Sequence, residues 1–394
     1  MSATVDHAAP SGAERSAATL LAPHDLVGDP AVVAAWGRLA ASARHANPFL
    51  GPAVLLPALR HLAGGDDVRL LAVGAPGRLD LLLPVAAHQR VRRTPVRASV
   101  AWAHTHHFLG TPLVSPTLDQ RGWRAALAAV ATAGDAWFLL PHTDLDVVRE
   151  VESAAAASGL LTRRLEEQTR PVTHRRERDD YAERRLSGRR RKELRRVRRR
   201  LEEDLGGGLA LVDLADGASP SDLEAALAQF LALEASGWKG ADGGAMAARP
   251  AERAFFLEAC RALAAEGRLE LLALRGRAGG AAAMAVVLRD GATQFTFKIA
   301  YDEQHAARSP GLLLYLDQLS LFHASGATLV DTCAAPDHPM ARRLHGDDRT
   351  LVTLAVGLGP RRGAPAVRWA QTTTRTAAAV RRHRRPPAPR EDHP

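Results

Sequence analysis

The chain has 394 residues, 46% of them hydrophobic and 24% charged, which is long enough for two domains and excludes a disordered or fibrous protein. Its two cysteines, Cys260 and Cys333, are too few for a disulfide framework or a cysteine-based zinc site, and this favours a reducing, cytoplasmic location. The sequence contains no run of about 20 apolar residues and no basic start followed by an apolar segment. Neither a membrane span nor a signal peptide is therefore predicted.

The net charge of +9 comes from two segments. Residues 184–200 hold eleven basic side chains and one acid, and residues 360–394 hold nine arginines and two acids. The rest of the chain is therefore acidic overall. Only three of the 52 basic residues are lysines, namely Lys192, Lys239 and Lys298. In a chain so rich in arginine, a lysine indicates a position where the planar guanidinium of arginine cannot replace the lysine ammonium group.

The first half of the chain predicts a domain with both strands and helices over residues 21–178. Between residues 68 and 114, apolar runs separated by turn residues are typical of β-strands. A helix over about 121–134, a short strand and a second helix over 145–158 follow, the last with Asp144 as its N-cap. The first 20 residues lack apolar periodicity and are predicted to be disordered.

A charged helical connector is predicted over residues 179–206, ended by glycines. Leu186, Leu194, Val197 and Leu201 give this helix only a narrow apolar stripe, so much of its charge is exposed. Two interpretations stay open. The arginines can pair with the acidic domains, or they can contact an anionic polymer such as nucleic acid, or anionic lipid.

The second half, residues 207–358, has a distinctive order of elements: strand, two helices, three strands, helix, strand, helix, strand. A basic disordered tail is predicted over residues 359–394. The elements expected in this half are strand 209–214, helix 220–235, helix 251–265, strands 268–275, 281–289 and 292–300, helix 310–324, strand 327–333, a short helix near 337–345 and strand 350–356.

The segment from strand 292–300 to the start of the next helix contains groups suited to bind a ligand. Ser309 is a good N-cap, Pro310 fits the first helical turn, and Gly311 lets the backbone approach a ligand. The helix start therefore predicts an anion site, with an ordinary capped helix as the alternative. Strict strand alternation places the polar residues Gln294, Thr296 and Lys298, with Ala300, on one face, and Phe295, Phe297, Ile299 and Tyr301 on the other.

This order of elements resembles the GNAT acyltransferase fold. In that family the loop after the fourth strand reads Gln/Arg-x-x-Gly-x-Gly/Ala, and its amides bind the pyrophosphate of acyl-CoA. Here Arg308 and Gly311 match the motif, whereas Leu313 departs from it. The segments "GWKG … FTFKIAYDE … SPGLLL … VD" are similar in sequence to the CelD-like branch of the family. This branch is associated with cellulose or other exopolysaccharide synthesis and is related to Fem-type aminoacyl transferases. The resemblance implies an α+β fold with a mixed sheet and two tandem GNAT-like domains, the first of them degenerate.

The resemblance also implies a co-substrate, acetyl-CoA or another acyl-CoA, and no metal. An acceptor amine or hydroxyl would attack the thioester directly, in polysaccharide or cell-envelope metabolism. The acceptor would be a small molecule or a saccharide. The implied ligand-binding residues are Arg308, Ser309, Gly311, Leu312 and Leu313 for the pyrophosphate, Ile299 and Ala300 for the thioester, and Trp238, Lys239 and His338 for the acceptor.

Four side chains are candidates for catalysis. Lys298 could stabilise the thioester oxyanion, and Tyr301 could protonate the leaving thiolate. Glu234 could act as the base for the acceptor, and Asp331 would reach the mouth of the cleft. Each has a structural alternative: a surface lysine, a core aromatic, a solvated helix-end carboxylate and a turn residue. GNAT enzymes often carry the acid as a tyrosine after the fifth strand; this chain has histidines there, such as His338, so the acid stays open.

Two other functions stay open. The first is an aminoacyl-tRNA-dependent, Fem-like transferase or an RNA-binding module that uses the basic helix, and the second is an inactive scaffold in a polysaccharide-synthesis complex. Cys333 and His338 allow a covalent mechanism, although a core role for the thiol is commoner. His104, His106 and His107 are interpreted as loop or surface residues, because no further metal ligand follows at a suitable spacing.

Overall fold

The first half of the chain forms the strands and helices predicted between residues 68 and 158, with one strand and four helices before them in the described residues. The computed structural model describes residues 17–372 except 65, 76, 92, 93, 95, 238–243, 278 and 360. The strands of this half are β1 (Ala18–Leu21), β2 (Val68–Ala75), β3 (Arg78–Gln89), β4 (Ala98–Ala101), β5 (Leu113–Val114), β6 (Trp137–Asp144) and β7 (Thr162–His174). The helices are α1 (Pro23–Val27), α2 (Pro30–Ser42), η1 (Pro48–Leu50), α3 (Pro52–Leu62), α4 (Gln120–Ala131) and α5 (Leu145–Ala157).

The second half follows the predicted order of elements closely. Its strands are β8 (Ala210–Asp213), β9 (Leu269–Arg275), β10 (Ala281–Asp290), β11 (Thr293–Tyr301), β12 (Leu329–Asp331) and β13 (Asp347–Gly357). Its helices are α6 (Tyr181–Arg185), α7 (Gly188–Asp204), α8 (Pro220–Ser236), η2 (Met246–Ala248), α10 (Pro250–Ala265), η3 (Glu303–Arg308), α11 (Pro310–Ser325) and α12 (Pro339–Leu344).

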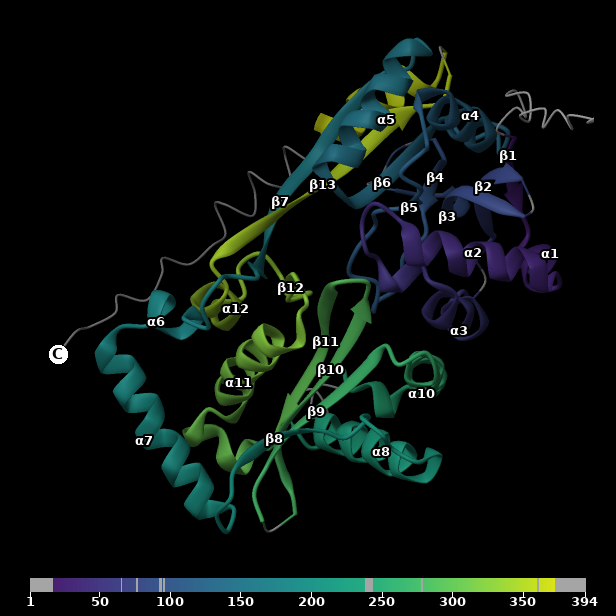
Figure 1. The fold of residues 1–394 in the computed structure, drawn as a ribbon. Helices are drawn as coiled ribbons and strands as arrows, with labels where there is room; N and C mark the ends of the chain where they lie inside the picture. Colours follow the sequence, from purple (N-terminus) through teal and green to yellow (C-terminus); the bar gives the residue numbers. More distant parts are fainter. Residues whose placement is uncertain are drawn as a thin grey trace, which may run out of the picture.

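One mixed sheet of thirteen strands joins the two halves. The strand order is β1-β2-β3-β4-β6-β13-β7-β12-β11-β10-β9-β8, and β5 pairs with β3. Around the strands of the second half, α8 and α10 pack on one face and α11 packs on the other (Figure 1). The predicted α+β fold with a mixed sheet is therefore confirmed.

The two halves repeat the same strand pairing. β1 to β4 pair antiparallel at one end of the sheet, and β8 to β11 do so at the other end. In each half the fourth of these strands then pairs in parallel with the strand that follows the next helix. Both parallel contacts, β4 with β6 and β11 with β12, extend over three residue pairs only. This repeat is the tandem GNAT-like organisation predicted from the sequence.

The last strands of the two halves are exchanged. β7 pairs with β12 of the second half, and β13 pairs with β6 of the first half. β7 and β13 also pair with each other at the centre of the sheet. The last strand of each predicted domain, 21–178 and 207–358, therefore lies beside a strand of the other domain.

Helix α7 packs on the molecule through the narrow apolar stripe predicted for it. Leu194 and Leu201 are buried in a cluster with Leu313 and Tyr315 of α11. Ser187 accepts the N–H of Arg190 at 3.2 Å and so caps the start of the helix. Figure 1 shows α7 at the edge of the molecule, so the face opposite the stripe turns to solvent.

The order of the chain extends further at both ends than predicted. β1 begins at Ala18 and pairs with β2, although disorder is expected up to residue 20. Residues 363–372 are helical, although the tail is expected to be disordered from 359. Burial explains the second difference, because Val367 and Ala370 pack in a cluster with Trp137. In the described ranges, no helix is both long enough and apolar enough to cross a membrane.

Candidate functional site

The sheet opens between β11 and β12. These strands pair in parallel only from Thr293↔Leu329 to Phe295↔Asp331, and the second part of β11 continues without β12 beside it. Two cavities lie at this opening, with volumes of about 180 Å³ and about 330 Å³. Tyr301, Gly311 and Met340 line both cavities, so the two spaces adjoin.

The smaller space, here called the glutamate cavity, carries two carboxylates. It is lined by Glu234 at the end of α8 and by Glu303 in η3, together with Ile299, Ala300 and His338. Glu234 is only 2% exposed, and its Oε2 accepts the N–H of Met246 at 3.0 Å. Glu234 is therefore a buried residue of the cavity wall and not the solvated helix-end carboxylate that the sequence also allowed.

His338 has a defined orientation in the glutamate cavity. It is the N-cap of α12, and its Nδ1 accepts the N–H of Ala341 at 3.3 Å. This bond leaves Nε2 as the ring nitrogen that can contact a ligand. The structure thus brings together Glu234, Tyr301 and His338, which the sequence predicts from three separate segments.

The larger space, here called the arginine cavity, lies beside the start of α11. Arg190 of α7 and Arg343 of α12 line it, with Ser309, Gly311 and Leu312. Ser309 has φ 47° and ψ 51°, a left-handed conformation, and its side chain does not cap the helix. The predicted N-cap role of the Ser309 hydroxyl is therefore wrong, although the residue does stand at the N-terminus of the helix.

The first turn of α11 offers fewer main-chain donors than predicted. The N–H of Ser309 donates to Ala306 O, and the N–H groups of Leu312 and Leu313 donate to Ser309 O, at 2.9–3.2 Å. Pro310 has no N–H. Among residues 309–313, only the N–H of Gly311 has no backbone acceptor within the described chain.

The other residues expected at the pyrophosphate are turned away from it. Arg308 donates from Nε to Asp204 at 2.9 Å, so its side chain ties η3 to the end of α7. Leu313 is buried in the cluster beneath α11. Arg308, which matches the family motif, and Leu313, which departs from it, therefore line neither cavity.

A β-bulge in β11 changes the face on which Lys298 lies. The consecutive residues Val286 and Val287 of β10 pair with Lys298 and Thr296, so Phe297 is the extra residue. The strict alternation expected from the sequence is therefore wrong at this point, and Lys298 does not share a face with Thr296. A single sequence carries no signal for this bulge, because pairing with β10 defines it.

Lys298 consequently faces the contact between the two halves. Its Nζ lies 5.8 Å from the centre of the Phe297 ring. Burial, and then the charge of Lys298, lower the pKa of His106 to about 4. Lys298 lines neither cavity, whereas the next three residues, 299–301, line the glutamate cavity.

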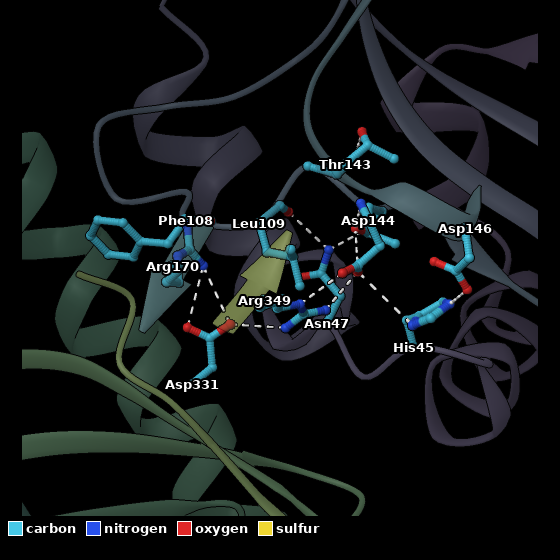
Figure 2. Close-up of polar contacts among 12 residues, drawn as sticks. His45, Asn47, Phe108, Leu109, Thr143, Asp144, Asp146, Arg170, Asp331 and Arg349 are labelled. Atoms are coloured by element: carbon cyan, nitrogen blue, oxygen red, sulfur yellow. Dashed lines mark hydrogen bonds and ion pairs between the residues drawn. The ribbon is translucent and has the colours of Figure 1, made fainter. Parts of the chain in front are cut away.

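Asp331 lies in a buried ion network instead of the cleft (Figure 2). Its carboxylate pairs with Arg170 at 3.3 Å and with Arg349 at 2.9 Å. Arg349 also pairs with Asp144 at 2.6 Å, and Arg170 donates to Phe108 O. The network joins β12, β7, β13 and β6, where the strands of the two halves are exchanged.

The pKa of Asp144 reflects this environment. Burial alone raises the pKa of the carboxyl, but the hydrogen bonds and charge of Arg349 outweigh burial and lower it below its usual value. Arg349 therefore has an ionised partner in Asp144, and neither Arg349 nor Arg170 lines a cavity.

The three histidines lie in the loop between β4 and β5, as the sequence allowed, but their rings are packed between the halves and not at the surface. The side chain of His106 is buried, stacks on Phe255, and places Nε2 2.9 Å from Glu252. Burial lowers the pKa of His104 to about 2 and that of His107 to about 4, so both rings are neutral. Within the described residues, no group of three or more His, Cys, Asp or Glu is arranged to hold a metal.

Two predicted acceptor-binding residues, Trp238 and Lys239, lie outside the described residues. Cys333 is buried, and burial raises the pKa of its thiol well above the usual value, which disfavours a nucleophilic thiolate. Three charged residues of the cavities are not predicted individually from the sequence: Arg190, Glu303 and Arg343. They come from α7, η3 and α12, and only the fold brings these elements together.

Comparisons with known proteins agree with this architecture. Residues 188–338 match the family described as acetyltransferase (GNAT) domain. The crystal structure of FemX is similar, with 12% identity, a TM-score of 0.56, and coverage of 82% of this chain and 95% of that chain. A conserved protein of unknown function from Bacteroides thetaiotaomicron VPI-5482 shows 12% identity, a TM-score of 0.52, and coverage of 84% and 97%.

A tandem GNAT protein from the clavulanic acid biosynthesis pathway shows 16% identity and covers 87% of this chain and 98% of its own, at a TM-score of 0.44. No curated protein sequence matches the chain. At these identities the structural likeness shows the fold alone. The repeated strand pairing gives the chain a tandem GNAT-like fold, and the match to the acetyltransferase (GNAT) domain family is confined to residues 188–338.

Proposed function

We propose that this protein is an acyl-CoA-dependent acyltransferase that moves an acetyl or longer acyl group to an amine or hydroxyl. The observation that carries the proposal is the pair of adjoining cavities at the opening between β11 and β12. One cavity lies beside the uncapped start of α11 and is lined by arginines. The other contains the buried carboxylate of Glu234. The two spaces thus differ in charge, as a polyanionic donor and a proton-releasing acceptor require.

The donor would span both cavities. Its phosphates would lie in the arginine cavity, near the N–H of Gly311 and the positive end of the α11 dipole. The thioester would then lie beside Ile299 and Ala300 in the glutamate cavity, where the two spaces meet at Tyr301. The acceptor, a small molecule or saccharide of polysaccharide or cell-envelope metabolism, would enter on the Glu234 side.

The cavity residues allow a direct transfer. Glu234 would take a proton from the acceptor as its nitrogen or oxygen attacks the thioester carbonyl. The new C–N or C–O bond forms, the C–S bond breaks, and Tyr301 would give a proton to the leaving thiolate. His338 Nε2 is an alternative donor of that proton. Lys298 and Asp331 take no part in this scheme, because neither lines a cavity.

A second candidate function rests on the solvent face of α7. The exposed basic residues of this face form no ion pair with any other described residue; they are Arg189, Lys192, Arg195, Arg196, Arg199 and Arg200. They span 12 positions of the helix, or about 16 Å at the usual rise. This unpaired charge supports contact with an anionic polymer and favours a Fem-like, aminoacyl-tRNA-dependent transferase as the rival.

Native mass spectrometry with acetyl-CoA, longer acyl-CoAs, free CoA and tRNA separates the two candidates. An acyltransferase of the proposed kind retains CoA and turns over one of the acyl-CoAs. The rival predicts tight tRNA binding with a steep salt dependence, about 0.9 in log K per neutralised phosphate on duplex, and no consumption of acyl-CoA. A variant with Arg195, Arg196, Arg198 and Arg199 changed to Gln would lose that tRNA binding and keep any acyl-CoA turnover.

A further inference from the structure

The arginine cavity lacks the main-chain donors that a phosphate-binding loop needs. Of residues 309–313, only Gly311 offers an N–H without a backbone acceptor in the described chain. An acyl-CoA carries a pyrophosphate and a further phosphate, so one N–H and a helix dipole leave most of this charge uncompensated. Arg308, the basic residue of the loop, is paired with Asp204. The missing positive charge must come from elsewhere in the fold.

Two arginines from outside the strand–loop–helix segment line the cavity, Arg190 and Arg343. Arg190 donates from Nη1 to Glu193 at 2.7 Å, but its buried Nε has no hydrogen-bond partner. Arg343 is exposed, and its guanidinium forms no ion pair with any described residue. Both side chains thus keep donors for a ligand.

Three other arginines near the cavity, by contrast, have acceptors within the chain. Arg198 pairs with Asp317 at 2.7 Å, and Arg342 pairs with Asp348 and donates to Thr169. Arg185 donates to the carbonyl groups of Arg342 and Arg343, which fixes α12 beside the start of α7. The chain therefore positions the two elements that carry the cavity arginines, and it occupies the donors of Arg185, Arg198 and Arg342 with its own acceptors.

We propose that Arg190 and Arg343 form a clamp for the phosphates of the acyl donor. The inference rests on the proposed function, and it gives the basic helix α7 a part in donor binding. A guanidinium presents a planar set of N–H donors that matches a phosphate, which suits both positions. The clamp takes the place of the main-chain N–H groups of Ser309, Leu312 and Leu313, which already donate to backbone carbonyl groups.

Calorimetry on the full chain tests the clamp with CoA and with pantetheine, which lacks phosphate. The variants are Arg190→Gln, Arg343→Gln and the double variant. The matched control is Arg189→Gln, an exposed neighbour in α7 that lines neither cavity. Each single variant is expected to lower CoA affinity about 10-fold or more, and the double variant further, since each loses charge-assisted hydrogen bonds. The affinity of these variants for pantetheine should stay at the wild-type level. The Arg189→Gln control should bind CoA with wild-type affinity.

The outcomes separate the clamp from the function on which it rests. If wild type binds CoA and the double variant binds it equally well, the clamp is wrong and the acyltransferase proposal stands. If the double variant loses pantetheine as well, the arginines shape the cavity and do not hold phosphate, which also overturns the clamp. If wild type binds no CoA, or a tRNA acceptor-stem RNA displaces it, the donor proposal itself fails.

Discussion

Helices α4 and α11 occupy the same position in the two halves of the sheet, but their first turns differ. In the chain, α4 lies between β4 and β6, and α11 lies between β11 and β12. Each helix therefore connects two strands that pair in parallel. In α4, the carboxylate of Asp119 accepts the N–H of Gly122 at 3.0 Å, and the side chain of Leu118 fills the space over that glycine. In α11 no side chain caps the turn, and a Cβ on Gly311 would meet Tyr301 only at 3.7 Å. Local residues therefore decide whether this position can take an anion.

The openings beside these helices differ in the same way. In the first half, Gly110 packs against Pro141 of β6 and donates its N–H to His142 O at 3.0 Å. The side chain of Asn47 holds the adjacent carbonyl of Leu109 (Figure 2). The chain itself thus occupies the space beside β6, whereas the corresponding space in the second half is the glutamate cavity. The first half is filled at this position, whereas the second half is open there.

The largest effect is expected where the two halves join. Asp331→Asn would leave Arg170 and Arg349 without their shared carboxylate charge in a buried position. Breaking one side of a buried ion pair costs about 3–5 kcal/mol, so the free energy of unfolding in denaturant should fall by that amount. Unchanged stability together with lost turnover would instead return Asp331 to the catalytic role that the sequence allowed.

Gly311→Val would convert the open turn of α11 into a filled one. The added Cβ itself has room, but the valine methyl groups would occupy both cavities. We expect CoA affinity in calorimetry to fall by about 10²-fold, with the melting temperature unchanged, because the N–H of Gly311 becomes inaccessible. Gly311→Ala is the matched control and should lose much less. A folded valine variant with wild-type affinity would remove the main support for the donor site.

Tyr301→Phe separates chemistry from binding in the second half. Tyr301 lines both cavities at the proposed position of the thioester sulfur. Loss of a general acid lowers turnover by about 10²-fold or more, while CoA affinity should stay near the wild-type value. Steady-state kinetics with a parallel CoA titration measure both quantities. If turnover persists, His338 is the next candidate for the acid.

Asp119→Ala would open the first turn of α4 without creating a site. Losing this N-cap should cost about 1 kcal/mol of stability. CoA stoichiometry should not change, because Leu118 and the segment at Gly110 still fill the first half. A second bound CoA in this variant would show that the cap alone had closed the first half.

The smallest effect is expected for Lys298→Met. Lys298 faces Phe297 and His106 and lines neither cavity. Turnover should therefore fall much less than the 10²-fold loss expected when an oxyanion donor is removed. A loss of that full size would mean that Lys298 reaches the substrate in the complex.

Local signals predicted the element order of the second half and the helix start at Pro310, since periodicity and turn residues lie next to one another in the sequence. Long-range pairing decided what was missed. The bulge at Phe297 exists only against β10, and the exchange of β7 and β13 depends on partners more than 150 residues apart. From the sequence alone, Asp331 is interpreted as a residue at the end of a strand. Its pairing with Arg170 of the first half is visible only in the structure.

The stoichiometry of CoA binding tests the central contrast most directly. Calorimetric titration of the wild-type chain with CoA should give one site per chain, because α11 alone among the described helices begins with an uncapped turn beside an arginine cavity. The same titration of Gly311→Val should show no site. Two sites in the wild type, or none, would contradict the division into one supporting half and one donor-binding half.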